Sequence, residues 1–271
     1  MIEVKNLVKR YGNHLALDNV SFTIQKGEVV GFLGPNGAGK STTMNIITGY
    51  LSSTEGDVLV DGVSVLEQPE KAKQKIGYLP ELPPLYTDMT VNEYLSFVCD
   101  LKGVPAKQKE ETLARVTKQA RISDVRKRLI RNLSKGYKQR VGIARAFVAK
   151  PKVIFADEPT GNLDSTTSRQ VLYSMLEMAK SYGITFVMVT HEKELAYCGD
   201  RIVTIKDGRV LDNVLLGEDE KAENRRRLFG DVTSGDIAEP ETTVPEEKKP
   251  AARQAKAVAA AVAEKVNQES M

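Results

Sequence analysis

The chain has 271 residues, of which 41% are hydrophobic and 28% charged, so it can bury one large core and is not collagen-like, coiled-coil or wholly disordered. The 39 basic and 36 acidic residues leave a formal net charge of +3, which does not favour a nucleic-acid partner, and we expect none. Two cysteines alone make neither a disulfide framework nor a zinc site, and no run of about 18 apolar residues indicates a membrane helix. We therefore expect a protein of the reducing cytosol that reaches a membrane only through a partner.

The amino-terminal part of the chain is predicted to be rich in β-strands. Segments 2–9 and 20–25 alternate apolar and polar residues on either side of a turn at 11–13. An apolar strand over 29–33 leads through a glycine-rich loop into a helix over 40–48. Another strand, 58–60, ends at an Asp-Gly turn.

Helices are predicted for the middle of the chain. Thr90 and Glu93 form a capping-box pattern, which predicts a helix beginning there and running through Leu101. Two further helices are predicted over 105–120 and 137–149. We expect these helices to form a subdomain over about 85–150.

The next part of the chain alternates strands and helices. A strand is predicted over 152–156, a helix over 165–181, a strand over 184–190 and a hairpin over 201–212. Such alternation predicts an α/β fold with a mainly parallel core sheet and helices on both faces. The amino-terminal strands would add an antiparallel β part to one domain over 1–230.

The last 41 residues, 231–271, have a different composition. They contain three prolines, no aromatic residue and few bulky apolar ones, so they cannot bury enough surface to offset the entropy of ordering. We predict a low-complexity, disordered tail. Its alanine-rich segment 251–268 carries valines at every fourth position, a pattern compatible with a weak helix.

The segment GPNGAGKS matches the phosphate-loop pattern G-x-x-x-x-G-K-[ST], with an apolar strand before it and a helix after it. Glycines let backbone N–H groups approach phosphate oxygens, and the helix adds the positive end of its dipole. We expect Lys40 to reach the β- and γ-phosphates of a nucleoside triphosphate and Ser41 to ligate Mg²⁺. The pattern alone does not separate kinases, GTPases, motors and transporters. The predicted phosphate-binding residues are Gly34, Pro35, Asn36, Gly37, Ala38, Gly39, Lys40, Ser41 and Thr42.

Polar side chains follow two later apolar strands. Asp157 and Glu158 end one of them and His191 follows the next, so all three belong at the carboxyl edge of the sheet, where ligands bind. We expect Asp157 to hold the shell of Mg²⁺ through water and Glu158 to polarise the attacking water. An imidazole at a strand end can hydrogen-bond both the γ-phosphate and that glutamate.

The segment LSKGY at 133–137 resembles the LSGGQ signature of ATP-binding cassette (ABC) ATPases. With GPNGAGKS, FADEPTGNLD and VTH in the family's order and spacing, residues 1–212 resemble a nucleotide-binding subunit of an ABC transporter. The resemblance implies that Tyr11 stacks on adenine, that Ser134, Lys135 and Gly136 contact the nucleotide of another subunit, and that the loop ending at Asp164 crosses the dimer interface. It implies catalytic roles for Lys40, Glu158 and His191.

That resemblance also implies ATP and Mg²⁺ as cofactors, a homodimer or heterodimer of ATPase subunits, and an integral membrane permease as partner. The chain would then lie peripherally on the cytoplasmic face of the cell membrane and power transport by hydrolysing ATP. Its sequence departs from the family pattern at Glu81, where glutamine is usual, and at Lys135 and Tyr137 of the signature. A carboxylate remains a possible Mg²⁺ ligand, but it cannot donate an amide hydrogen bond.

Two segments bear on the direction of transport. Segment 77–97 resembles bacterial export ATPases of the multidrug, antibiotic-peptide and polysaccharide group, and ADEPTGNLDS resembles the lipoprotein-release and macrolide-export branch, so we favour export. An importer subunit, a soluble ABC ATPase acting on ribosomes or DNA, and a small-molecule P-loop kinase remain as alternatives. The single cassette without a long coiled-coil insertion speaks against the soluble ATPase, and LSKGY with the Asp-Glu pair speaks against the kinase.

Overall fold

The computed structural model describes residues 1–230. The predicted tail, 231–271, with its possible helix over 251–268, lies outside the described residues. Within residues 1–230, every helix is too short or too polar to cross a lipid bilayer.

The amino-terminal part forms an antiparallel sheet with the strand order β2-β1-β4-β5. Its strands are β1 (Ile2–Tyr11), β2 (His14–Ile24), β4 (Glu55–Val60) and β5 (Val63–Ser64). One face of this sheet is buried and the other is exposed. Along β2, the buried residues are Val20, Phe22 and Ile24, and the exposed residues between them are Ser21 and Thr23. This period of two confirms the predicted half-buried strands.

A second sheet has the order β10-β9-β3-β8-β7-β6, and every neighbouring pair except β10 with β9 is parallel. Its strands are β3 (Val29–Leu33), β6 (Ile76–Leu79), β7 (Val153–Asp157), β8 (Thr185–Thr190), β9 (Arg201–Lys206) and β10 (Arg209–Leu215). Every residue of β3 and β8 is buried, as expected for strands covered on both faces. The predicted α/β fold with a mainly parallel core sheet is confirmed.

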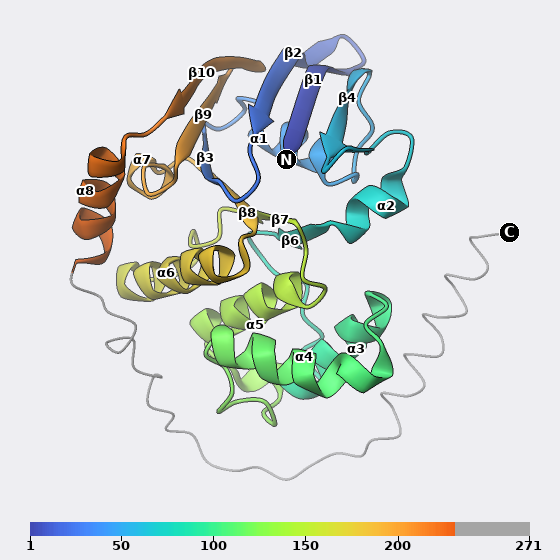
Figure 1. The fold of residues 1–271 in the computed structure, drawn as a ribbon, viewed down its shortest axis with the longest axis vertical. Coiled ribbons are helices and arrows are strands. Elements are labelled where there is room, and N and C mark those ends of the chain that lie inside the picture. The colour runs from blue at the N-terminus through green and yellow to red at the C-terminus, as the bar shows by residue number, and fades with distance from the viewer. Residues whose placement is uncertain (231–271) are drawn as a thin grey trace, which may run out of the picture. The chain divides into compact units, whose positions relative to one another are not determined.

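Helices cover this sheet, and α3, α4 and α5 gather into a lobe of their own (Figure 1). The helices are α1 (Lys40–Ile47), α2 (Pro69–Gln74), α3 (Val91–Leu101), α4 (Ala106–Gln119), α5 (Lys135–Phe147), α6 (Ser165–Tyr182), α7 (Lys193–Ala196) and α8 (Glu218–Phe229). The capping box at Thr90 is present, because its side chain accepts from the Glu93 N–H while the Glu93 carboxylate accepts from the Thr90 N–H. The helical subdomain predicted over about 85–150 stays a prediction, and α3, α4 and α5 fall within that range.

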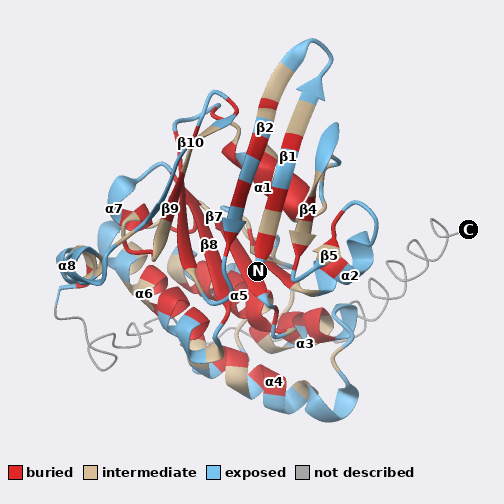
Figure 2. Cartoon of the chain, turned by 45° about the horizontal axis from the view of Figure 1, so that its top comes forward, coloured by how far each residue is buried: buried red, intermediate tan, exposed pale blue. Residues whose placement is uncertain are grey.

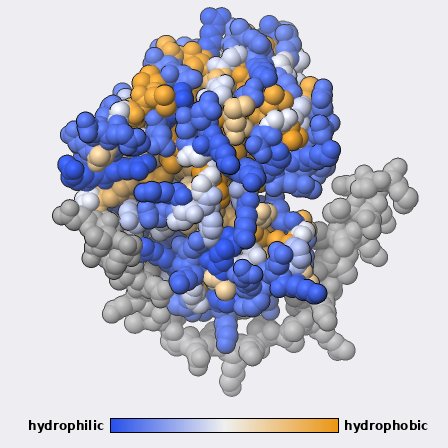
Figure 3. All heavy atoms as spheres, viewed as in Figure 1, coloured by the Kyte–Doolittle hydropathy of each residue, from blue (hydrophilic) through white to orange (hydrophobic). Residues whose placement is uncertain are grey.

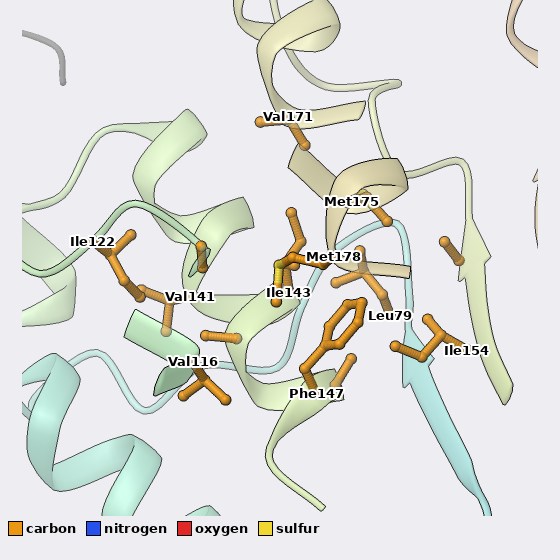
Figure 4. Packing of buried hydrophobic residues seen from close by; sticks show 14 of the residues in the cluster. Leu79, Val116, Ile122, Val141, Ile143, Phe147, Ile154, Val171, Met175 and Met178 are labelled. Carbon is orange, nitrogen blue, oxygen red and sulfur yellow. The ribbon is translucent and has the colours of Figure 1, made fainter. Parts of the chain in front are cut away.

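The core lies on both sides of the parallel sheet (Figure 2). Successive residues of a strand pack on opposite faces of the sheet. Phe155 of β7 belongs to a cluster with Met44 of α1, whereas Ile154 belongs to a cluster with Phe147 of α5. Figure 4 shows the Phe147 ring beside Leu79, and Ile154 belongs to the same cluster. The strands are thereby covered by apolar side chains on both faces of the sheet.

Several element boundaries differ from the predictions. Helix α5 begins at Lys135, two residues earlier than predicted, because Ser134 caps it by accepting from the Tyr137 N–H. Strand β2 begins at His14, six residues before the predicted start, because it pairs with β1 directly after the turn.

Helix α8 was not predicted, since its sequence EDEKAENRRRLF is almost entirely polar. It is held by tertiary contacts: the Phe229 ring packs edge-on against Tyr173, and the Lys221 ammonium lies 2.7 Å from an Asp200 carboxylate oxygen.

On the face drawn in Figure 3, hydrophobic side chains gather over β10, where Leu211 and Leu215 are exposed.

Candidate functional site

The candidate site lies at one edge of the parallel sheet, where four neighbouring strands end. In the order β3-β8-β7-β6, these strands lead into the glycine-rich loop, His191, Glu158 and Glu81. Because parallel strands end at a common edge, segments far apart in the sequence meet there. The strand that ends at Asp157 and the strand that precedes His191 are direct neighbours.

The glycine-rich loop forms a pocket of about 290 Å³. The residues that line it are Tyr11, His14, Ala16, Asn36, Gly37, Gly39, Lys40, Ser41 and Thr42. Seven of these were predicted from the sequence. Gly34, Pro35 and Ala38 belong to the same loop but do not line the pocket, and the Lys40 ammonium donates to the carbonyls of Gly34 and Pro35 at 2.7 and 3.0 Å.

The loop needs its glycines for space and for backbone conformation. A Cβ on Gly34 would lie 2.3 Å from the Ile205 carbonyl oxygen, so no larger residue fits there. Gly39 has φ +101° and caps α1, a conformation that residues with a side chain rarely adopt. The first turn of α1 contains no acidic residue, so the positive end of its dipole is free to attract an anion.

Glu158 and His191 form a hydrogen-bonded pair beside this pocket. The His191 Nδ1 lies 2.8 Å from Glu158 Oε1, and the Thr190 hydroxyl donates to Glu158 Oε2 at 3.4 Å. The hydrogen bond and the negative charge of Glu158 together raise the pKa of His191. Glu158 has φ +42°, in the left-handed region, and its N–H donates to the Val189 carbonyl, so the backbone holds the carboxylate toward the imidazole.

Asp157 lies among charges of both signs. Burial raises the pKa of its carboxyl, and the neighbouring carboxylates of Glu158 and Glu81 raise it further, whereas the Lys40 ammonium acts in the opposite direction. A bound divalent cation would favour the ionised form of such a group.

The oxygen atoms at this edge fit Mg²⁺, which binds one or two protein carboxylates together with nucleotide phosphates. Among residues 1–230, no three His, Cys, Asp or Glu side chains are grouped so that they alone could hold a metal. A cation here would therefore share its coordination between Ser41, a carboxylate and a phosphate.

Glu81 contacts the loop that follows Glu158. Its Oε1 accepts from the Asn162 amide at 3.0 Å. Glutamine, the residue usual in the resembling family, could make this contact through its carbonyl oxygen only. The glutamate therefore adds negative charge at this position while it keeps the link between the two loops.

The signature residues occupy a different place from the pocket. Ser134 caps α5, and a Cβ on Gly136 would lie 2.7 Å from the Thr167 methyl group of α6. Asp164 caps α6 by accepting from the Thr167 N–H at 3.0 Å, and this contact lowers the pKa of its carboxyl. None of the following four predicted nucleotide-binding residues lines the pocket: Ser134, Lys135, Gly136 and Asp164. Within one chain they are therefore separate from the predicted residues of the phosphate loop.

Two residues of this region were not identified from the sequence. His14, the first residue of β2, lines the pocket with Tyr11. The buried Gln139 amide donates to the Pro159 carbonyl at 2.8 Å and thereby joins the signature helix to the segment that follows Glu158. Both belong to segments that tertiary structure brings together, and no local pattern marks them.

Comparison with known proteins is consistent with this geometry. A family model described as ABC transporter matches residues 17–161. The probable multidrug ABC transporter ATP-binding protein YbhF of Escherichia coli (strain K12) is 34% identical over 212 residues, which are 78% of this chain but only 36% of YbhF. The methionine import ATP-binding protein MetN of Carboxydothermus hydrogenoformans is 38% identical over 220 residues, 78% of this chain and 65% of MetN.

A solved structure matches over nearly its whole length. This is the dimeric ATP-binding cassette MJ0796 in a post-hydrolysis state bound to ADP and Pi. It is 32% identical, has a TM-score of 0.71, and the match covers 80% of this chain and 99% of that one. The fold is thus shared over 80% of this chain.

Proposed function

This chain belongs to the ABC transporter family and is an ATPase, and from that premise we propose that it powers the export of a substrate through a separate membrane-spanning permease. The observation that carries ATP hydrolysis, the source of that power, is the Glu158–His191 pair, which lies at the same sheet edge as the pocket around Lys40. A phosphate-binding pocket beside a carboxylate held by an imidazole is suited to hydrolysis of a nucleoside triphosphate.

The proposed reaction is in-line attack of water on the γ-phosphorus of ATP. The Lys40 ammonium and the N–H groups of the loop bind the β- and γ-phosphates, and Tyr11 stacks on adenine. Glu158 accepts a proton as the water attacks, the bond from the γ-phosphorus to the bridging oxygen breaks, and ADP and phosphate form. His191 orients the Glu158 carboxylate and hydrogen-bonds the γ-phosphate.

Ser41, Asp157 and Glu81 are the residues that would hold Mg²⁺. When bound there, Mg²⁺ would neutralise charge on the β- and γ-phosphate oxygens. The strand order supports this assignment, because β3, which leads into the phosphate loop, and β7, which ends at Asp157, flank β8 and end at the same edge of the sheet.

We propose further that two ATPase subunits face each other, with the signature of one against the pocket of the other. In this chain Ser134, Lys135 and Asp164 are exposed and lie outside the pocket, so they are free to meet a nucleotide held by a second subunit. The dimeric state of MJ0796 supports this arrangement. A γ-phosphate bridging both subunits would favour the closed dimer, and its hydrolysis would favour opening.

The transport direction rests on sequence resemblance. The multidrug relative YbhF and the segment 77–97 favour export, whereas the similarity to the methionine import protein MetN favours import as the second candidate. In either case the chain would act at the cytoplasmic face of a membrane, bound to a permease.

Purification of the full chain in detergent from its own cells tests the assignment. Co-purification of an integral membrane protein that stimulates ATP hydrolysis would support it, while recovery of ribosomal RNA or DNA would contradict it. Inside-out vesicles containing the complex then distinguish the directions, because an exporter accumulates its substrate inside such vesicles when ATP is added outside.

A further inference from the structure

Glu158 has a backbone conformation that its place in the sequence disfavours. Its φ of +42° lies in the left-handed region, which residues with a side chain rarely adopt. Pro159 follows it, and the residue before a proline favours extended conformations. Such a backbone persists only where its surroundings hold it in place. The contacts made by this segment therefore decide where the Glu158 carboxylate lies.

Backbone hydrogen bonds hold both sides of Glu158, and a distant side chain holds the next residue. The Glu158 N–H donates to the Val189 carbonyl at 2.9 Å, and the Glu158 carbonyl accepts from the Gly161 N–H at 3.2 Å, which closes a turn. Inside this turn the Pro159 carbonyl accepts from the Gln139 amide at 2.8 Å. Gln139 thus holds the turn one residue after Glu158.

Gln139 makes this contact from a fixed position. It is only 6% exposed, and it belongs to α5, which packs against both α6 and β6. Pro159 is buried as well, so removing the amide donor would leave its carbonyl without this partner and away from water. The turn would then lose one of the contacts that offset its unfavourable backbone conformation.

The effect of Gln139 on chemistry has to pass through Glu158. Gln139 does not line the pocket around Lys40, and its side chain is buried under the turn. The Glu158 carboxylate, in contrast, lies 2.8 Å from the His191 imidazole at the edge of the sheet. A shift of the turn would move this carboxylate and leave the phosphate loop unchanged.

We propose that Gln139 is a positioning residue for ATP hydrolysis, whose buried amide holds the Glu158–Pro159 turn so that the Glu158 carboxylate stays against His191. This inference rests on the proposed function, since it takes Glu158 as the group that accepts the proton of the attacking water. It assigns to Gln139 a contribution to kcat and none to ATP binding.

The test measures steady-state hydrolysis of Mg²⁺-ATP by the full chain. Gln139→Met keeps the length of the side chain but removes the donor. Its kcat is expected to fall about 10- to 100-fold, because a misplacement of about 1 Å can cost 10²-fold, while KM stays within about twofold of the wild type. Thr117→Val is the matched control, because it removes a buried hydroxyl that donates to the Leu113 carbonyl at 2.7 Å within α4, and it should hydrolyse ATP like the wild type.

A double variant separates positioning from a general loss of structure. In the Glu158→Gln background, Gln139→Met is expected to cause no further loss of kcat, because the carboxylate that Gln139 positions is already absent. A merely structural defect would lower the remaining rate by the same factor in both backgrounds. Gln139→Leu, a second apolar replacement, should give the same two results, and thermal unfolding shows that each variant is folded at the assay temperature.

Three results would overturn the inference: wild-type kcat in the Gln139 variants, an equal fold loss in the Glu158→Gln background, or a loss of the same size in Thr117→Val. Wild-type turnover in Glu158→Gln alone would instead overturn the proposed role of Glu158, so the two failures are distinguishable.

Discussion

The imidazole of His191 and the carboxylate of Glu158 are joined by a contact of 2.8 Å between Nδ1 and Oε1, although 33 positions separate them in the chain. Parallel pairing of β7 with β8 brings the two strand ends together. The pair combines a proton acceptor with a group that orients it, and it underlies the first two predictions.

Glu158→Gln should reduce ATP hydrolysis by about 10²- to 10⁴-fold, because an amide cannot accept the proton of the attacking water. ATP binding should persist, and the nucleotide-bound dimer should become more stable. Phosphate release and size-exclusion chromatography with Mg²⁺-ATP measure these effects. Glu177→Gln, an exposed carboxylate on α6, is the control, and wild-type turnover in Glu158→Gln would show that another group accepts the proton.

The same contact makes the titration of His191 depend on Glu158. In the native chain the pKa of His191 is raised above its ordinary value of 6.5, so the pair stabilises the fold fully below pH 6.5 and loses this effect as the pH rises through the raised pKa. In Glu158→Gln the pKa of His191 should fall toward the ordinary value. NMR titration of the two histidines measures the difference, and an unchanged pKa would mean that the pair does not form in solution.

Replacing Glu81 with glutamine should leave ATP affinity nearly unchanged, because the contact with Asn162 can be kept through the amide oxygen. We expect the change to alter how strongly the permease stimulates hydrolysis. The ratio of stimulated to basal turnover in reconstituted vesicles measures this coupling. A large loss of ATP binding in Glu81→Gln would contradict the assigned position of this residue at the edge of the metal shell.

Tyr137 stands where the resembling family has glutamine, and here its ring is buried while its hydroxyl donates to Asp124 at 2.8 Å. Tyr137→Phe should lower the free energy of unfolding by about 1.5–3 kcal/mol, as expected for a lost hydrogen bond to a carboxylate. Urea denaturation of Tyr137→Phe, Asp124→Asn and the double variant checks this. Additive losses in the double variant would show that the contact does not contribute.

Phe147 links the helical lobe to the parallel sheet through its contacts with the cluster of Leu79 and Ile154 (Figure 4). Phe147→Ala should cost about 3–5 kcal/mol of stability, because it removes a large buried ring and leaves a cavity. The midpoint of urea denaturation measures the loss. A cost under about 1 kcal/mol would mean that the cluster closes over the cavity, which a rigid core resists.

Much of this molecule could be predicted from local patterns. The phosphate loop, the Asp157–Glu158 pair and the capped helix at Thr90 each depend on residues within a few positions of one another, so their spacing identifies them. The alternation of apolar strands with helices likewise predicts the parallel sheet, because such strands need cover on both faces. It also places the Asp157 strand beside that of His191.

Helix α8 shows the limit of such patterns. Its sequence has no apolar stripe, and contacts with Tyr173 and Asp200 hold it in place. A local sequence pattern does not show contacts with residues of other elements, so it cannot predict a helix that depends on such contacts.

The amino-acid sequence by itself indicated which chemical groups this protein carries: a glycine-rich loop that suits phosphates, and carboxylates and an imidazole at strand ends. Only the tertiary structure decided how these groups are combined. It joined Glu81 to Asn162, placed Gln139 against Pro159 and brought His14 to the pocket beside Tyr11. The reason is that each motif depends on residues close together in the sequence, which set the local backbone geometry. The contacts between distant loops form only when the two apolar faces of the sheet are buried, because that packing sets the positions of the loops.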